Sequence, residues 1–158
     1  MNDAQATIKA QSQDLEFTTF RVGDLLIGVD IQHVQEINRH VEVTPVPHSP
    51  GCVRGVINLR GDVVTVLELR AILGLPPAAL TSASRNVIVN AGSEKVGLLV
   101  DNVADVVATS AEGIESPPAN VSGVAGRFFT GVCKLEGQLL VVLDINEVLA
   151  ADNDDQNG

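Results

Sequence analysis

Apolar residues along this chain occur in short runs that are separated by turns containing glycine. Residues 17–22 suit a first strand, Gly23 and Asp24 predict a turn, and residues 25–29 predict a returning strand. The same order of strand, glycine turn and strand recurs at residues 55–67. Short strands joined by tight glycine turns form antiparallel hairpins, so the sequence predicts a fold built largely from hairpins.

Three short segments have a helical pattern instead. Apolar residues spaced by three predict a helical turn over residues 31–37, with Asp30 as its cap. Residues 67–74 predict a second helical turn that ends at Gly74, because glycine is the usual residue just after a helix. Residues 145–150 predict a short closing helix.

The second hairpin has a counterpart later in the chain. Shifting the sequence by 76 positions places residues 131–150 over residues 55–74 without a gap, and seven of the twenty positions are identical. Aliphatic strands match by chance, but two glycines six residues apart in both copies indicate an internal repeat. The identical pairs are Gly55/Gly131, Val56/Val132, Leu59/Leu135, Gly61/Gly137, Val66/Val142, Leu67/Leu143 and Leu73/Leu149.

A shift of 69 positions brings a second pair of segments into register, residues 17–37 and 86–106. We therefore predict two homologous halves, 15–79 and 83–150, within one domain over 15–150. Short strands at regular spacing point to small barrels, in which closure removes exposed strand edges. The sequence predicts an all-β fold of two packed SH3-like five-stranded β-barrel subdomains from an internal duplication, with short helical turns.

Both ends of the chain are polar. Residues 1–14 lack the basic start and the apolar run of a secretory signal, so we expect a cytoplasmic protein. Residues 151–158 are mostly acidic and amide residues, and we expect both ends to be disordered. The uninterrupted apolar runs are far shorter than the ~20 residues that span a bilayer, so no membrane insertion is expected.

Charge and aromatic content narrow the choice of partner. Twenty Asp and Glu against ten Lys and Arg give a formal net charge of −10, and four Phe are the only aromatic residues of the Phe, Tyr and Trp class. Nucleic acids and anionic membranes need a basic surface, and unpaired bases usually stack on aromatic side chains. The composition therefore disfavours nucleic acid and favours a neutral or basic protein surface as the partner.

Candidate catalytic chemistry is sparse. The sequence has no nucleophile elbow, no glycine-rich phosphate loop and no close cysteine pair. We therefore expect a protein that is not an enzyme and that uses no cofactor. One alternative stays open, a small-molecule or metal-binding β-barrel that uses His33, His40, His48 and Cys52, although no HExxH motif accompanies them.

The two repeats differ in charge at the tip of the glycine hairpin, where Arg60 aligns with Glu136. A solvated turn would explain this difference. An interface would explain it as well, because the planar guanidinium of arginine binds carboxylates with two hydrogen bonds and is enriched at protein interfaces. The repeats agree in placing an acid, Glu36 or Asp105, just before the last apolar residue of the helical segment.

These residues carry a resemblance to a known family. The run GVINLRGDVVTVLELR, preceded by GVDIQHVQEI and followed by VGLLVDNVADVV, closely resembles the CheW-like family of chemotaxis coupling proteins. The resemblance covers residues 17–150. It implies two packed five-stranded barrels and a non-enzymatic cytoplasmic adaptor, monomeric in isolation, that works in signalling arrays at the inner membrane. Its partners would be chemoreceptor cytoplasmic tips and the regulatory domain of the histidine kinase CheA.

The resemblance also implies partner-binding residues. Two motifs, VQEI and NLRG, fall where the family contacts its partners, and the second-half segment after Val100 would lie along the groove between barrels that receives a receptor helix. The sequence departs from the family at Thr65, where proline is common, and at Glu68, where aspartate is common. The residues implied are Val34, Glu36, Ile37 and Arg60 in the first half, and Val103, Asp105 and Val106 in the second.

Overall fold

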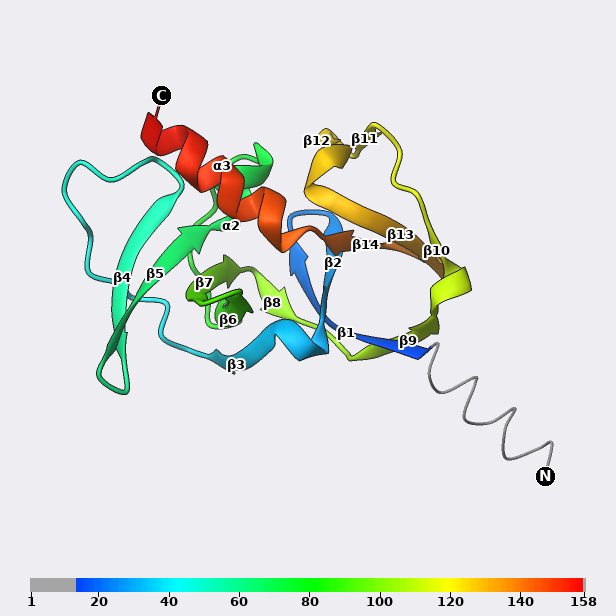
Figure 1. Cartoon of the computed structure of the whole chain (residues 1–158), viewed down its shortest axis with the longest axis horizontal. Helices are drawn as coiled ribbons and strands as arrows, with labels where there is room; N and C mark the ends of the chain where they lie inside the picture. The colour runs from blue at the N-terminus through cyan, green and yellow to red at the C-terminus, as the bar shows by residue number, and fades with distance from the viewer. Residues whose placement is uncertain (1–13, 158) are drawn as a thin grey trace.

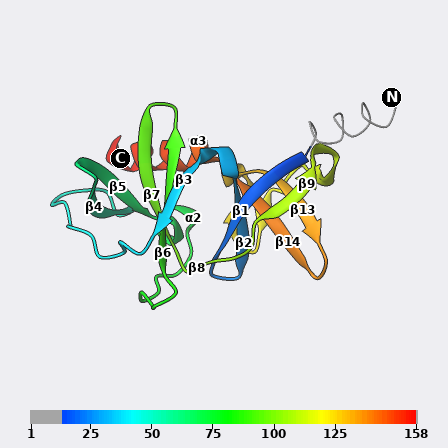
Figure 2. The same cartoon turned by 90° about the horizontal axis from the view of Figure 1, so that it is seen from below.

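The computed structural model describes residues 14–157 and places most of its strands in two β subdomains that lie side by side (Figure 1 and Figure 2). Two short strands, β11 (Asn120–Val121) and β12 (Val124–Ala125), form a separate two-stranded sheet. Subdomain A is a seven-stranded sheet, at the right of Figure 1, and subdomain B is a five-stranded sheet, at the left. The strands of A are β1 (Asp14–Val22), β2 (Leu25–Asp30), β8 (Asn102–Val103), β9 (Val107–Ser110), β10 (Ile114–Glu115), β13 (Phe129–Leu135) and β14 (Gln138–Leu143). The strands of B are β3 (Val34–Asn38), β4 (Val53–Leu59), β5 (Asp62–Glu68), β6 (Arg85–Ala91) and β7 (Glu94–Val100).

The predicted all-β fold of two packed subdomains is confirmed, and so are the predicted hairpins. Strands β1 and β2, β4 and β5, and β13 and β14 pair as antiparallel neighbours. The repeated glycines have matching places, because Gly55 and Gly131 lie at register shifts of β4 and β13, while Gly61 and Gly137 have positive φ at the turns. A Cβ on Gly55 would overlap the carbonyl of Thr44. Thr44 is held there by two backbone hydrogen bonds with Val56, one through its N–H and one through its carbonyl. The repeated spacing of the glycines therefore reflects two backbone features that each hairpin needs, a register shift in the first strand and a positive φ in the turn.

The halves of the repeat do not form one subdomain each, which differs from the prediction. Subdomain B is the continuous segment 34–100, whereas subdomain A combines residues 14–30 with residues 102–143. The first strand pair of each half joins the last strand pair of the other half, through parallel pairing of β2 with β14 and of β7 with β5. Each subdomain therefore contains one hairpin from each half, and A has seven strands in place of the predicted five.

The largest apolar cluster belongs to both subdomains. It joins fully buried side chains of A, such as Phe20 and Ile27, to fully buried side chains of B, such as Leu67 and Leu98. Burying apolar surface is the dominant favourable contribution to folding, and here neither subdomain can complete that burial alone. The cluster therefore packs the two subdomains together.

The helices differ from the predictions at two places. Helix α2 (Leu69–Leu73) ends at Gly74 as predicted, but residues 31–37 form only a 3₁₀ turn, η1 (Ile31–His33), before β3 begins. The spacing of three was misleading because Val34–Asn38 pairs with β6. None of the helices in residues 14–157 has the length and apolar character needed to cross a membrane.

The end of the chain differs from its prediction as well. Helix α3 (Ile145–Asn157) starts after β14 and passes over α2 toward subdomain B (Figure 1). It runs through most of the tail 151–158 that was expected to be disordered, since no glycine or proline interrupts residues 145–157. The predicted disorder of residues 1–14 falls outside the described residues, except that Asp14 begins β1.

A cluster of polar groups lies where the chain returns from B to A. The carboxylate of Asp101 accepts hydrogen bonds from Arg70 of α2, at 3.1 Å from Nε and 2.6 Å from Nη2, and from the backbone N–H of Gly23, at 2.8 Å. Burial opposes the charge on Asp101, but the hydrogen bonds from Arg70 and Gly23 outweigh it and lower its pKa. Asp101 therefore stays ionised in the folded protein at neutral pH.

Because strands of the two halves pair with each other, we can predict how the protein responds to cleavage between the halves. A protease site placed at residues 81–84 and then cut should leave both fragments together in size-exclusion chromatography, with the circular dichroism spectrum kept. Each fragment separated in denaturant and returned to buffer should give a poorly dispersed ¹H–¹⁵N spectrum, because the pairings β2–β14, β3–β6 and β5–β7 each join one fragment to the other. A fragment that refolds alone would contradict this topology.

The Asp101 cluster predicts a pH-dependent contribution to stability. Asp101→Asn should lower the free energy of unfolding by about 1 kcal/mol at pH 7, at the low end for a charged hydrogen bond because the side chain is 31% exposed. Since the folded-state pKa of Asp101 lies below the unfolded value, this stabilisation is complete above that unfolded value, near 3.8, and is lost as the pH falls through the folded-state pKa. The difference in urea unfolding between wild type and variant should therefore narrow below about pH 4, and an undiminished difference at pH 3 would be incompatible with this account.

Candidate functional site

The turn between β4 and β5 holds Arg60 at its tip. The φ angles of Arg60 and Gly61 are 52° and 90°, the left-handed values that the central residues of a type I′ hairpin turn require. The side-chain oxygen of Asn58 accepts a hydrogen bond from the backbone N–H of Gly61 at 2.9 Å. This tight turn fixes the direction in which the Arg60 side chain leaves the hairpin.

Arg60 forms a two-point ion pair with Glu36 of β3. Its Nη1 donates to Oε1 of Glu36, and its Nη2 donates to Oε2 at 3.3 Å. The hydrogen bond from Arg60 lowers the pKa of the Glu36 carboxyl, and the same pairing raises the pKa of Arg60, so both groups are charged at neutral pH. The Arg60 side chain is 70% exposed, whereas that of Glu36 is 21% exposed. The guanidinium therefore remains accessible to a partner while it is held by Glu36.

The other two predicted residues of the first half lie beside this pair on β3. Val34 is half-buried and packs against the shared core, whereas Ile37 is 38% exposed. Successive residues of a strand point to opposite faces, so Ile37 does not share the face of Glu36. We refer to Val34, Glu36, Ile37 and Arg60 together as the Glu36–Arg60 surface. It combines an ion pair with an exposed apolar residue on one strand and one hairpin of subdomain B.

The three predicted residues of the second half lie in subdomain A. Val103 pairs with Phe20 and packs against the shared core, while Asp105 accepts a hydrogen bond from the Thr19 hydroxyl through its backbone carbonyl. Val106 follows in the turn before β9 and is 54% exposed. The structure thus separates these residues from the Glu36–Arg60 surface. It also leaves them out of a groove that the described residues form near the border of the two subdomains.

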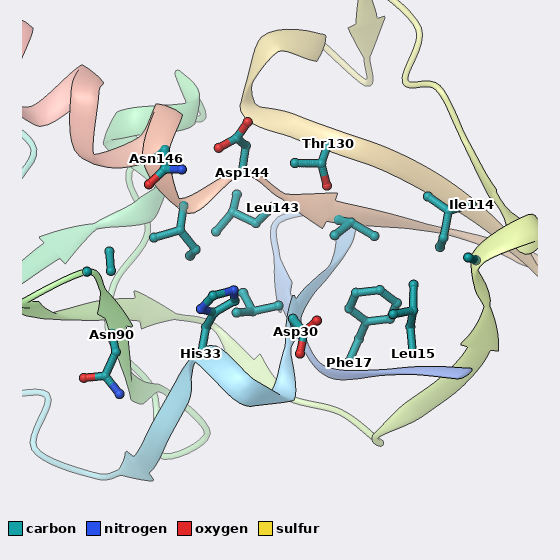
Figure 3. A pocket seen from close by; sticks show the side chains of 16 residues that line it. Leu15, Phe17, Asp30, His33, Asn90, Ile114, Thr130, Leu143, Asp144 and Asn146 are labelled. Atoms are coloured by element: carbon teal, nitrogen blue, oxygen red, sulfur yellow. The ribbon is translucent and has the colours of Figure 1, made fainter. Parts of the chain in front are cut away.

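That groove lies mostly in subdomain A, at its border with subdomain B, and has a volume of about 730 Å³. Figure 3 shows side chains of β1 and η1 along one wall and side chains around the end of β14 along the other. Subdomain B contributes the turn between β6 and β7. The wall residues labelled in Figure 3 are Leu15, Phe17, Asp30 and His33 on one side, and Thr130, Leu143, Asp144 and Asn146 on the other.

The polarity of the lining side chains changes along the groove. Leu15, Phe17 and Ile114 make one end apolar, whereas His33 and Asn90 lie at the polar end (Figure 3). An apolar surface with a few polar groups suits a binding site for an amphipathic segment. The groove is therefore a second candidate site, built from both subdomains.

Two aspartates lie on opposite walls of the groove. One oxygen of Asp30 accepts from the backbone N–H of Gln32 at 2.9 Å, and one oxygen of Asp144 accepts from that of Glu147 at 3.2 Å. Among the described residues neither carboxylate forms an ion pair. Each aspartate thus caps a helical segment and keeps a second oxygen for another donor.

The resemblance implied a groove between the barrels, but the residues that line this groove were not predicted, although one signal was present. Sequence analysis considered Asp30 only as a cap and His33 only as a metal ligand. The segments VDI (29–31) and LDI (143–145) lie at the ends of two buried strands, and those strands, β2 and β14, are parallel neighbours. Equivalent ends of parallel strands meet at one edge of a sheet, so the two aspartates come together. Using this signal requires knowing that strands 25–30 and 138–143 pair.

The alternative of a metal-binding barrel gains no support from the geometry. Within residues 14–151, no three His, Cys, Asp or Glu side chains are grouped closely enough to hold a metal ion. His33 lines the groove, His48 lies in the long β3–β4 connection with a φ of 63°, and Cys52 is buried. The proposed ligands therefore do not converge on one point.

Comparison with known proteins agrees with this architecture. The sequence profile of the CheW-like domain matches residues 16–153. The chemotaxis protein CheW of Rhizobium meliloti is 36% identical over 137 residues, covering 87% of this chain and 88% of that protein. The chemotaxis protein CheW of Treponema pallidum is 30% identical and covers 96% of this chain and 91% of that protein.

A solved structure shows the same fold. The scaffolding protein TtCheW from Thermoanaerobacter tengcongensis superposes with a TM-score of 0.77 at 29% identity, covering 82% of this chain and 88% of that one. The likeness includes both subdomains, since neither alone amounts to that share of the chain. Because the family profile spans nearly the whole chain and relatives of 30% identity or more match over most of their length, this chain belongs to the CheW-like domain family.

Proposed function

We propose that this chain is a chemotaxis coupling scaffold that joins the cytoplasmic tips of chemoreceptors to the regulatory domain of the histidine kinase CheA. The family membership and the similarity to a scaffolding protein support a coupling role over the metal-binding alternative. The scaffold works in the cytoplasm, in arrays that form beneath the receptors. It performs no catalysis, and its output is the placement of a kinase beside a receptor.

The observation that carries this proposal is the exposed guanidinium of Arg60, fixed by a tight turn and by Glu36. A hairpin tip adds little to the core, so a side chain fixed there is available for recognition. Val63, three residues after Arg60 on the same hairpin, is 72% exposed and supplies apolar contact area close to the charge. Ile37, next to Glu36 in β3, is 38% exposed on the other face of that strand. Arginine beside exposed apolar side chains is the composition expected of an interface core. We assign the kinase regulatory domain to this surface.

The inter-subdomain groove is the proposed receptor site. The resemblance to the CheW-like family implies that a receptor helix enters a groove between the barrels, and an amphipathic helix binds by laying its apolar face in a groove. The apolar end at Phe17 and Ile114 would receive that face, and the free carboxylate oxygens of Asp30 and Asp144 would receive a basic side chain. The predicted receptor residues Val103, Asp105 and Val106 remain candidates in β8 and in the connection between β8 and β9.

Two separate surfaces allow one small protein to hold two partners at once. Each surface is small, so each contact is expected to be weak, and the array gains its strength from many linked copies. The Glu36–Arg60 surface belongs to subdomain B alone, whereas the groove needs both subdomains. Substitutions should therefore separate the two activities.

The first test concerns Arg60. In calorimetric titrations with the CheA regulatory domain, wild type should bind at micromolar to tens of micromolar concentrations, and Arg60→Glu should weaken binding by about tenfold or more because the new carboxylate faces Glu36 and repels the partner's acidic groups. The circular dichroism spectrum should be unchanged because Arg60 is largely exposed.

A matched control uses the same change of charge elsewhere in subdomain B. Lys95→Glu removes an exposed cation of β7 that pairs with Asp62 at 3.9 Å, and it should leave kinase binding within about threefold of wild type, as is usual for an exposed ion pair. Equal losses for both variants would mean that net charge governs binding. An unfolded Arg60→Glu protein would make Arg60 a structural residue and would remove it from the proposed site.

The second test concerns the groove. Thr130 is exposed on its wall, so Thr130→Arg should fill the groove without disturbing the core and should weaken binding of a soluble receptor-tip fragment by about tenfold. Binding of the CheA regulatory domain should stay at the wild-type value. The same substitution at exposed Thr81, in the connection between α2 and β6, is the control. Receptor binding that survives Thr130→Arg would place the receptor on another face.

A further inference from the structure

The polar cluster around Asp101 lies at a point where the chain passes from one subdomain to the other. The chain leaves A for B through η1, between β2 and β3, and it returns through the single residue Asp101, between β7 and β8. The backbone N–H of Asp101 donates to the carbonyl of Arg21 in β1 at 3.0 Å. Asp101 is therefore bonded to both subdomains through its backbone and its side chain.

Arg70 completes this connection from the side of subdomain B. It extends from α2, which follows β5, and its guanidinium binds Asp101 with Nε and Nη2 while Nη1 donates to the carbonyl of Pro76 at 2.8 Å. The Arg70 side chain is only 15% exposed, the lowest value for a basic residue among the ion pairs of the described residues. Three of its donors are thus committed to fixed partners, which leaves the guanidinium one orientation.

The other contacts across the boundary do not fix an angle as strictly. The shared core attracts the subdomains toward each other, but apolar burial has no preferred direction. A guanidinium bound to a carboxylate at two points has a defined plane and direction. The remaining ion pairs of the described residues lie within B, within A, or between the η3 turn (Gly126–Phe128) and α3.

Strand β7 links this cluster to the groove. It ends at Val100, next to Asp101, and it begins at Glu94, just after the β6–β7 turn that lines the groove with Asn90, Ala91 and Gly92. Seven strand residues span about 20 Å at 3.3 Å per residue, so a rotation of about 5° at Asp101 would move the turn by about 2 Å. A displacement of that size is large compared with the width of a side-chain contact.

We infer that Arg70, Asp101 and the Gly23 N–H form a latch that sets the angle between the two subdomains and thereby the shape of the groove. Arg70 and Asp101 are positioning residues, because neither lines the groove. The structural half of this inference concerns the free protein alone. Its consequence for receptor binding rests on the proposed function.

The test measures the angle and the binding separately. Residual dipolar couplings of backbone amides, fitted with one alignment tensor for each subdomain, should show a change of several degrees in the relative orientation in Asp101→Asn and in Arg70→Gln. Receptor-tip affinity should fall by about 3- to 10-fold in both variants, and affinity for the CheA regulatory domain should not change, because the Glu36–Arg60 surface lies within B. A purely stabilising role would leave the orientation and the ratio of the two affinities as in wild type.

One control variant and one alternative latch variant accompany this test. Asp62→Asn makes the same chemical change in the exposed Lys95 pair within B and should leave the orientation unchanged. Arg70→Gln keeps the bond between Gly23 and Asp101, so it serves if Asp101→Asn does not fold. Unchanged couplings in a folded latch variant would overturn the inference. A wild-type protein that binds no receptor fragment would instead refute the proposed receptor site, while the couplings would still decide whether the latch exists.

Discussion

Two parallel strand pairings hold this molecule together. β2 lies beside β14, and β7 lies beside β5, so each sheet is completed by a strand from the other half of the repeat. The arrangement of the subdomains, the core and the groove depends on this pairing between the two halves. It forces subdomain B to be one continuous segment between two parts of A, it makes the largest apolar cluster common to both, and it brings the ends of β2 and β14 together, where their aspartates face one groove.

The two candidate sites differ in how they depend on that framework. The Glu36–Arg60 surface needs only β3 and the β4–β5 turn, which are local to B, and its geometry comes from a type I′ turn and one ion pair. The groove is a product of assembly, because residues of A and its connections form the two facing walls while the β6–β7 turn of B lies at the polar end. A scaffold with one local site and one assembled site has a physical means of responding at the second without changing the first.

The sequence predicted the hairpins, the helical turn that stops at Gly74, and the duplication, because each of these is encoded by neighbouring residues. The glycines at 55, 61, 131 and 137 were the clearest signal, and their positions at register shifts and turns explain the spacing. The strand Val34–Asn38 was mistaken for helix because its pairing with β6 is decided by tertiary contacts. The same limit hid the pairing of strands between the two halves and therefore the residues that line the groove, whose aspartates lie 114 positions apart and meet only through β2 and β14. Arg60 and Glu36 were identified separately in the sequence, and their ion pair appeared only in the structure.

The parallel pairing of β2 with β14 also has a consequence for the order of events during synthesis. The β1–β2 hairpin emerges from the ribosome first, yet Leu26 has no neighbour on that side until Leu140 has been made. Subdomain B, from residue 34 to residue 100, can pair all of its strands long before that. The apolar face of the hairpin is therefore exposed through most of translation, and contacts between such distant segments form slowly. For this fold, the first strands to appear are among the last to be secured.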